Sequence, residues 1–270
     1  MKKNARCCVK EVLPKAPAAP DLEGLQRVLA ALSLNFAAEA LCEHLTRAVK
    51  EELAAAAFLE GLLREELEQR EERRVRTGLR LSALPTGQTI SNFDFAFQPS
   101  VERSKIEALA TCAWIRQKHS LLIQGPPGVG KTHLCVALGV KAVACGFSVA
   151  FYRLEELLHV LRKDADVAPS RLKSKKYMKA GLLLVDELGF QPFTRAEANL
   201  FFRLVSYRYQ RGSICITSNK AIRDWPEMLA GDEVLTAAIL DRLLHGSQVL
   251  NIKGRSYRLR DLEASLQARA

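Results

Sequence analysis

The sequence predicts an α/β fold, in which a parallel five-stranded sheet is sandwiched by helices and preceded by a small all-helical module. From about residue 100, short apolar runs alternate with helical stretches, as they do where crossover helices connect parallel strands. Residues 21–80 instead show helical periodicity and no strand pattern. The predicted strands are residues 121–124, 148–153, 182–186, 213–218 and 248–252.

Changes in composition divide the chain into four segments. Prolines and alanines dominate the end of the first 20 residues, which predicts a loose leader. Pro85 and Gly87 interrupt the pattern after the helical region, so a linker is expected there. The predicted segments are a flexible leader (1–20), a helical module (21–80), a linker (81–100) and a sheet-containing domain (101–270).

Three apolar stripes at helical spacing predict three helices in the N-terminal module. Asp21 is expected to cap the first helix, because an aspartate side chain accepts hydrogen bonds from free N–H groups at a helix start. Charges of both signs alternate over residues 65–74, which is typical of a solvated helix face. The stripes are Leu25, Leu29 and Leu32; Phe36, Ala40, Leu41, Leu45 and Val49; and Leu53, Phe58, Leu59, Leu62, Leu63 and Leu67.

The composition is typical of a globular protein in a reducing compartment. It is 48% hydrophobic and 26% charged, and no apolar run reaches the length of a membrane helix. The first 20 residues lack the apolar core of a secretory signal. The seven cysteines are irregularly spaced without a C-x-x-C pair, so neither a zinc site nor a disulfide framework is expected. A cytoplasmic location follows, with no membrane partner.

The net charge of +10 suits a polyanionic partner, either nucleic acid or an acidic membrane surface. Many globular proteins are mildly basic without binding either partner. The charge alone therefore does not decide between nucleic acid, an acidic membrane surface and no polyanionic partner.

A phosphate-binding loop is predicted between the first strand and the helix that follows it. Residues 125–132 read Gly-Pro-Pro-Gly-Val-Gly-Lys-Thr and match G-x-x-x-x-G-K-[ST] in the required strand–loop–helix context. Backbone N–H groups would surround phosphate oxygens, Lys131 would neutralise the β- and γ-phosphates, and the Thr132 hydroxyl would ligate Mg²⁺. The predicted ATP-binding residues here are Gly125, Pro126, Pro127, Gly128, Val129, Gly130, Lys131, Thr132 and His133.

Two acids at the end of the third strand predict the metal and water chemistry of ATP hydrolysis. Asp186 and Glu187 follow four apolar residues, so they reach the sheet edge where the phosphates are expected. Asp186 would hold Mg²⁺, directly or through water, and Glu187 would orient and polarise the attacking water. Asn219 follows the fourth strand, whose end should lie beside them, and could hold that water or the γ-phosphate.

These motifs, within longer blocks, resemble the IstB family, the ATP-binding helper proteins of two-gene insertion sequences. The resemblance covers nearly the whole chain, and the helicase loader DnaC is a related protein that shares the Asp-Arg and Ser-Tyr-Arg blocks. The matching blocks are residues 125–134, 185–190 and 217–219, Trp225, and residues 238–245 and 254–258.

The resemblance implies an AAA+ ATPase without a full helical lid. Such a protein would form a homo-oligomer with shared ATP sites on double-stranded DNA and would stimulate or target its cognate transposase. It also implies that Arg242 is an arginine finger for a neighbour's γ-phosphate and that Arg258 occupies the second sensor position. A DnaC-like helicase loader is the alternative, and a DNA-binding scaffold that uses ATP only for assembly is disfavoured by Glu187.

A basic stretch between the second and third strands is the candidate DNA surface. Residues 162–179 are strongly basic and contain one aromatic residue, Tyr177, so contact with backbone phosphates fits better than base stacking. A solvated charged loop is the alternative. The predicted DNA-binding residues are Arg171, Lys173, Lys175, Lys176 and Lys179.

Overall fold

The structure, a computed structural model, describes residues 21–260, so the leader predicted for residues 1–20 lies outside the described residues. The chain forms two compact units, Met1–Arg73 and Arg74–Ala270. The division falls inside helix α3 (Ala55–Ser82). Among the described residues, no helix combines the length and apolar character needed to cross a membrane.

The first unit is helical, as predicted. Helices α1 (Leu22–Ala31) and α2 (Asn35–Lys50) pack with the first part of α3 around a small core of Ala37, Leu41 and Leu62. The Glu66 carboxylate is buried beside this core, where it accepts hydrogen bonds from the Ala37 N–H at 2.8 Å and from Arg70 Nε at 2.6 Å.

Two details of this unit differ from the sequence prediction. Asp21 stands at the N-cap position, but its side chain makes no capping hydrogen bond and instead forms an ion pair with Arg27 at 3.5 Å. Of the third apolar stripe, Leu62 is buried, whereas Leu59 and Leu67 are 52% and 66% exposed. The two helices α1 and α2 are too few to bury apolar residues on every side of the 28-residue helix α3.

The second unit contains the predicted parallel sheet. Its strands run in the order β2-β3-β4-β1-β5, and every neighbouring pair is parallel. All five predicted strands are confirmed to within two residues at each end. Their bounds are β1 (Leu121–Gln124), β2 (Val149–Arg153), β3 (Leu182–Leu188), β4 (Ser213–Ser218) and β5 (Gln248–Asn251).

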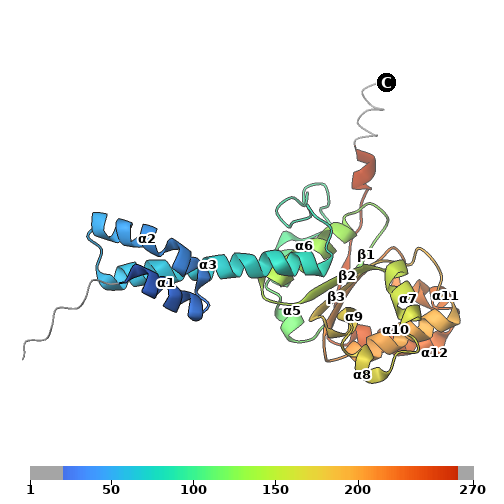
Figure 1. Cartoon of the computed structure of the whole chain (residues 1–270). Helices are drawn as coiled ribbons and strands as arrows, with labels where there is room; N and C mark the ends of the chain where they lie inside the picture. The colour runs from blue at the N-terminus through green and yellow to red at the C-terminus, as the bar shows by residue number, and fades with distance from the viewer. Residues whose placement is uncertain (1–20, 261–270) are drawn as a thin grey trace, which may run out of the picture. The chain divides into compact units, whose positions relative to one another are not determined.

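Helices cover both faces of this sheet (Figure 1). One face carries α4 (Arg103–Ala110), α5 (Ala113–Arg116) and α6 (Lys131–Ala144). The other carries α7 (Leu154–Lys163), α10 (Arg195–Arg208), α11 (Trp225–Met228) and α12 (Glu233–Leu244). The shorter elements are α8 (Pro169–Leu172), α9 (Lys176–Lys179), η1 (Ile222–Asp224) and η2 (Tyr257–Leu259).

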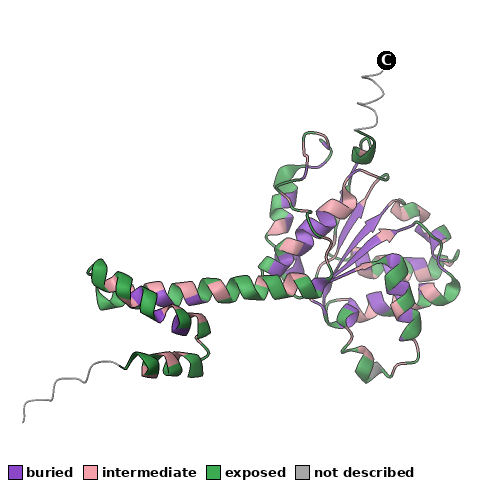
Figure 2. Cartoon of the chain, turned by 45° about the horizontal axis from the view of Figure 1, so that its top comes forward, coloured by how far each residue is buried: buried purple, intermediate pink, exposed green. Residues whose placement is uncertain are grey.

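Alternate side chains of each strand pack into two separate hydrophobic cores, one on each face of the sheet. In β4, Ile214 and Ile216 face the α7–α10–α12 layer, whereas Cys215 faces the α6 layer. The central strands β1, β3 and β4 are therefore buried on both faces, and most of the strand residues are purple in Figure 2. This explains why the strands read as continuous apolar runs in the sequence.

The segment 81–100, for which the sequence predicts a linker, is part of the second unit and packs into it. Phe93 is buried in the α6-side core. The Gln98 side chain donates from Nε2 to the Arg255 carbonyl at 2.9 Å, and the Ser100 hydroxyl donates to the Lys253 carbonyl at 2.7 Å. These contacts fix the segment against the chain that follows β5.

Arg208, the last residue of α10, ties together the amino ends of the strands. Its side chain is 1% exposed and donates to four backbone carbonyls at 2.7–3.1 Å. The acceptors belong to Tyr177, Met178, Ala180 and Ser213, so one guanidinium satisfies the end of α9 and the starts of β3 and β4.

Replacing Arg208 by alanine should destabilise the second unit by about 3 kcal/mol or more, because several buried carbonyls lose their donor and a cavity remains. Urea unfolding followed by circular dichroism measures the change. The control is Arg211→Ala, since Arg211 is exposed and its guanidinium donates to the Tyr207 carbonyl and lies over the Tyr207 ring, at the surface. That variant should change stability by at most about 0.5 kcal/mol. Equal losses in both variants would contradict the anchoring role of Arg208.

Candidate functional site

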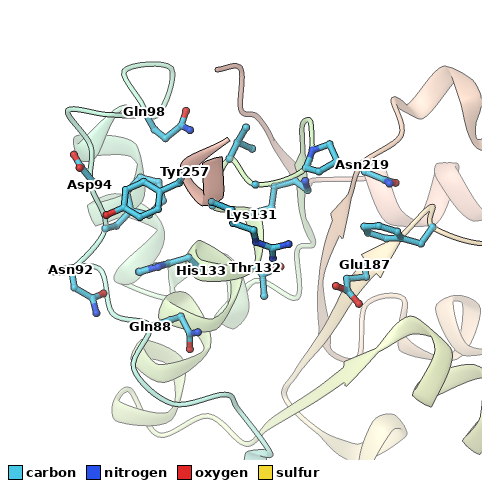
Figure 3. A pocket seen from close by; sticks show the side chains of 17 residues that line it. Gln88, Asn92, Asp94, Gln98, Lys131, Thr132, His133, Glu187, Asn219 and Tyr257 are labelled. Atoms are coloured by element: carbon cyan, nitrogen blue, oxygen red, sulfur yellow. The ribbon is translucent and has the colours of Figure 1, made fainter. Parts of the chain in front are cut away.

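A cavity of about 290 Å³ lies at the carboxyl edge of the sheet. The loop after β1, the end of β3 and the residue after β4 all line it, because parallel neighbouring strands bring their carboxyl ends together. In Figure 3, Lys131 and Thr132 lie between Tyr257 and His133 on one side and Glu187 and Asn219 on the other.

The loop from Gly125 to Gly130 has the backbone that a phosphate-binding loop needs. Gly125, Gly128 and Gly130 all have positive φ angles. At Gly130 a Cβ atom would lie 2.6 Å from the Phe93 ring, so a larger residue would also clash. Helix α6 begins at the next residue, and its free N–H groups and positive dipole end face this loop.

Lys131 stands at the start of α6 and lines the cavity. Its Nζ donates to the Pro126 carbonyl at 2.8 Å across the loop. Burial lowers the pKa of Lys131; the nearby Asp186 opposes this shift and Arg258 adds to it. A phosphate group in the cavity would favour the charged ammonium.

Thr132, Asp186 and Thr217 form a hydrogen-bond network beneath the cavity. The Asp186 carboxylate is 2% exposed, and its Oδ1 accepts from the Thr132 hydroxyl at 2.9 Å and from the Thr217 hydroxyl at 2.5 Å. A hydroxyl beside a carboxylate is the hard-oxygen ligand set that Mg²⁺ prefers. These residues therefore fit the predicted magnesium ligands, with the remaining positions left for water and phosphate.

Glu187 occupies an unusual backbone position at the end of β3. The ladder between β3 and β4 is interrupted between Val185 and Leu188, and Glu187 has a φ of 66°, in the left-handed region. Its N–H donates to the Thr217 hydroxyl at 3.0 Å. Its carboxylate lines the cavity and lies 3.9 Å from Arg153 Nε at the end of β2.

Asn219 follows β4 and lines the same cavity. Its Oδ1 is buried and has no hydrogen-bond partner among residues 21–260. An amide at this place could meet a water or a phosphate oxygen between itself and Glu187.

His133 and Arg258 line the cavity from other sides. The His133 Nε2 atom lies 2.8 Å from the Thr89 carbonyl, which ties α6 to the segment before the sheet. Arg258 belongs to η2, which is held against the phosphate-binding loop because the Tyr257 N–H donates to the Gly128 carbonyl at 2.9 Å.

Arg242 lies away from this cavity. It stands in the last turn of α12, just before β5, and lines a different cavity at the amino edge of the sheet. Its Nη1 donates to the Ala238 carbonyl at 2.7 Å, and its guanidinium lies 5.1 Å from the centre of the Phe202 ring.

The predicted DNA-binding residues are not equivalent in the structure. Four of them are exposed: Arg171, Lys173, Lys176 and Lys179. Lys175 is half-buried, and its Nζ pairs at 2.8 Å with Asp164, a carboxylate that is 6% exposed and also accepts from the Tyr177 hydroxyl. The Lys175 charge is therefore compensated within the chain.

Sequence reasoning missed two groups of residues at this site. Thr217 contacts Asp186, and Arg153 lies beside Glu187. Both contacts join neighbouring strands of the folded sheet, so they cannot be recognised in the sequence. The side of the cavity remote from Glu187 is built by the segment predicted as a linker, together with the chain after β5. The additional lining residues are Gln88, Asn92, Phe93, Asp94, Gln98, Phe190 and Tyr257.

Comparison with known families places residues 27–265 in the family model of the IstB-like ATP binding protein. The ATP-binding protein of insertion sequence IS21 from Pseudomonas aeruginosa is 43% identical over 241 residues, which are 89% of each chain. That of insertion sequence IS5376 from Geobacillus stearothermophilus is 38% identical over 209 residues, covering 77% of this chain and 83% of the relative.

Among solved structures, AMPPCP-bound DnaA from Aquifex aeolicus has a similar fold. The TM-score is 0.51 at 17% identity, over 69% of this chain and 56% of DnaA. With the sheet order, this similarity confirms the predicted AAA+ fold class.

We expect Lys131→Ala to weaken ATP binding by at least roughly tenfold, because a phosphate loses a charge-assisted contact. Calorimetric titration with ATP measures the affinity. Lys141→Ala is the matched control, since Lys141 is exposed near the other end of α6. An unchanged affinity for Lys131→Ala would place the phosphates elsewhere.

Proposed function

Since this chain belongs to the family of IstB-like ATP binding proteins, we propose that it is an Mg²⁺-dependent ATPase that assembles on double-stranded DNA and stimulates or targets the transposase of an insertion sequence. Curated relatives from insertion sequences support the biological setting. The arrangement of the sites at the two sheet edges supports hydrolysis at an ATP site shared between subunits.

In this mechanism the chain's own groups bind and orient the reactants. The loop of residues 125–130 and Lys131 bind the phosphates of ATP, and Thr132 and Asp186 would hold Mg²⁺, which supplies charge neutralisation when bound. The oxygen of the attacking water bonds to the γ-phosphorus while Glu187 accepts a proton from that water. The bond between the γ-phosphorus and the β–γ bridging oxygen breaks at the same time, so ADP leaves. Asn219, whose Oδ1 has no hydrogen-bond partner in the described part of the chain, holds that water.

The position of Arg242 is the observation that carries the assembly part of the proposal. The ATP cavity lies at the carboxyl ends of the strands, whereas Arg242 lies at their amino ends. Strand β4 spans six residues between these edges, which is roughly 20 Å. Arg242 therefore cannot serve the cavity of its own chain, and we assign it to the γ-phosphate of a neighbouring subunit.

A mixture of two inactive variants tests this shared site. Arg242→Ala and Glu187→Gln should each bind ATP, because the phosphate-binding loop is intact in both, and each should lose turnover by on the order of 10³. On mixing, partial ATPase activity should return, since one interface can pair an intact Glu187 with an intact Arg242 from its neighbour. A coupled assay of phosphate release, with and without DNA, measures the activity.

The matched control for Arg242→Ala is Arg223→Ala, because Arg223 is an exposed arginine that lines neither cavity. This variant should hydrolyse ATP at the parent rate. Full activity of Arg242→Ala alone, or no recovery although mixed oligomers form, would show that the finger does not act between subunits.

For the DNA contact we propose the exposed members of the basic stretch, Arg171, Lys173, Lys176 and Lys179. They lie on α8, α9 and the turn between them, at the amino edge that also carries Arg242. The sequence prediction also includes Lys175, but its ion pair with Asp164 supports a structural role.

Four phosphate contacts would make DNA affinity fall by roughly 150-fold between about 50 and 200 mM salt. Replacing Lys173, Lys176 and Lys179 together by alanine should reduce the logarithmic salt slope by about three. Lys175→Ala should leave the slope nearly unchanged, because its ammonium is already neutralised. Fluorescence anisotropy of a labelled duplex measures both. A slope unaltered in the triple variant would locate the DNA surface elsewhere.

The transposase partner is tested by comparing two candidate clients. The chain, with ATP and DNA, is mixed with a transposase of an IS21-type insertion sequence and, separately, with a bacterial replicative helicase. ATP-dependent binding and stimulation of the transposase are expected. Binding of the helicase alone would favour the helicase-loader function instead.

A further inference from the structure

A second cavity, of about 250 Å³, lies where the chain enters three neighbouring strands. Its walls come from residues 117–120 before β1, from the end of α10 to the start of β4, and from the end of α12 before β5. Because β4, β1 and β5 are adjacent in the sheet, these three segments meet at its amino edge.

The charged groups that line this cavity all carry positive charge. Lys118, Arg208 and Arg242 line it together with His119 and His245, and no aspartate or glutamate is among the described lining residues. Lys118 is exposed, so its ammonium is available to a ligand.

Arg208 forms part of the wall as a buried cation that has no anionic partner among the described residues. Its four hydrogen bonds all go to neutral backbone carbonyls, and its Nε has no partner among residues 21–260. Burial lowers the pKa of Arg208 to about 10, and the nearby Tyr207 opposes this shift only in part. An anion in the cavity would compensate this charge.

Helix ends account for only part of this positive charge. Arg208 and Arg242 stand in the last turns of α10 and α12, where the helix dipole favours a cation. Lys118 and His119 lie outside both helices, in a turn where Lys118 has a φ of 61°. A Cβ atom at Gly246, whose φ is 66°, would lie 2.7 Å from the His119 ring, so glycine is needed for the approach of the turn before β5.

We propose that this cavity is a second anion site, which takes a phosphate-bearing group on Lys118, His119 and His245 beside Arg242. The inference rests on the proposed function only for the source of that group. In an assembly with Arg242 at a neighbour's ATP, the source is the phosphates of that nucleotide. In DNA binding, the source is the duplex backbone, because Arg208 also holds the end of α9 within the basic stretch.

Histidine-selective NMR of the whole chain tests the site, with tripolyphosphate as the probe. The chain has five histidines, of which His119 and His245 line the second cavity and His133 lines the ATP cavity. In the Lys131→Ala chain, tripolyphosphate should shift the His119 and His245 signals and leave His44 and His159 in place. Adding Lys118→Asn should weaken this binding by roughly tenfold, as expected for one lost charge-assisted contact.

Asparagine is chosen at position 118 because it tolerates the left-handed backbone. Lys141→Ala in the same Lys131→Ala background is the control for loss of positive charge elsewhere and should bind tripolyphosphate unchanged. Absence of His119 and His245 shifts at millimolar tripolyphosphate, or equal affinities with Lys118 and with asparagine, would overturn the proposal.

Two further arms identify the source. Labelled Lys131→Ala chain is mixed with ATP and unlabelled Glu187→Gln chain, and shifts of His119 and His245 that need both additions assign the group to a neighbour's nucleotide. Shifts produced by a short duplex alone assign it to DNA. Tripolyphosphate can shift the His119 and His245 signals while neither the ATP mixture nor the duplex does so. The anion site is then confirmed for free phosphate compounds, and the assembly part of the proposed function fails.

Discussion

The interaction on which the site depends is the hydrogen-bond network of the Asp186 carboxylate. It accepts from Thr132 at the start of α6 and from Thr217 in β4, so one buried carboxylate joins three elements that the chain visits far apart. The parallel order β3-β4-β1 makes this possible, since it brings the three carboxyl ends to one edge. The same Thr217 hydroxyl accepts from the Glu187 N–H and so supports the left-handed backbone that turns Glu187 toward the cavity.

The two edges of the sheet carry different sets of functional side chains. The carboxyl edge collects the phosphate-binding loop, the two acids and Asn219, whereas the amino edge collects Arg208, Arg242, Lys118 and the basic stretch. On the proposed function, a nucleotide cavity at one edge and Arg242 at the other would let copies stack edge to edge, with Arg242 of one copy meeting the nucleotide of the next. This arrangement would make hydrolysis depend on assembly, as the proposed function requires.

The strands and the phosphate-binding loop could be predicted because their signals are local. Strands buried on both faces are rich in consecutive apolar residues, and the loop needs glycines at positions where φ is positive. Both features can therefore be recognised in a short stretch of sequence. The sequence predictions were wrong where the burial of a residue depends on partners that are distant in the chain. Leu59 and Leu67 have the apolar character of core residues but remain exposed, and the segment predicted as a linker buries Phe93 and supplies part of the cavity wall.

The sequence by itself thus determined the fold class, the strand positions and the phosphate-binding loop. Only the tertiary structure decided which of those residues meet, because contacts between strand ends depend on strand order, which no short window encodes. It separated Lys175, neutralised by Asp164, from its exposed neighbours, and it placed Arg242 at the far edge from Glu187. It also assembled Lys118, Arg208 and His245 from three segments into one basic cavity, since adjacent strands share an edge whatever their distance along the chain.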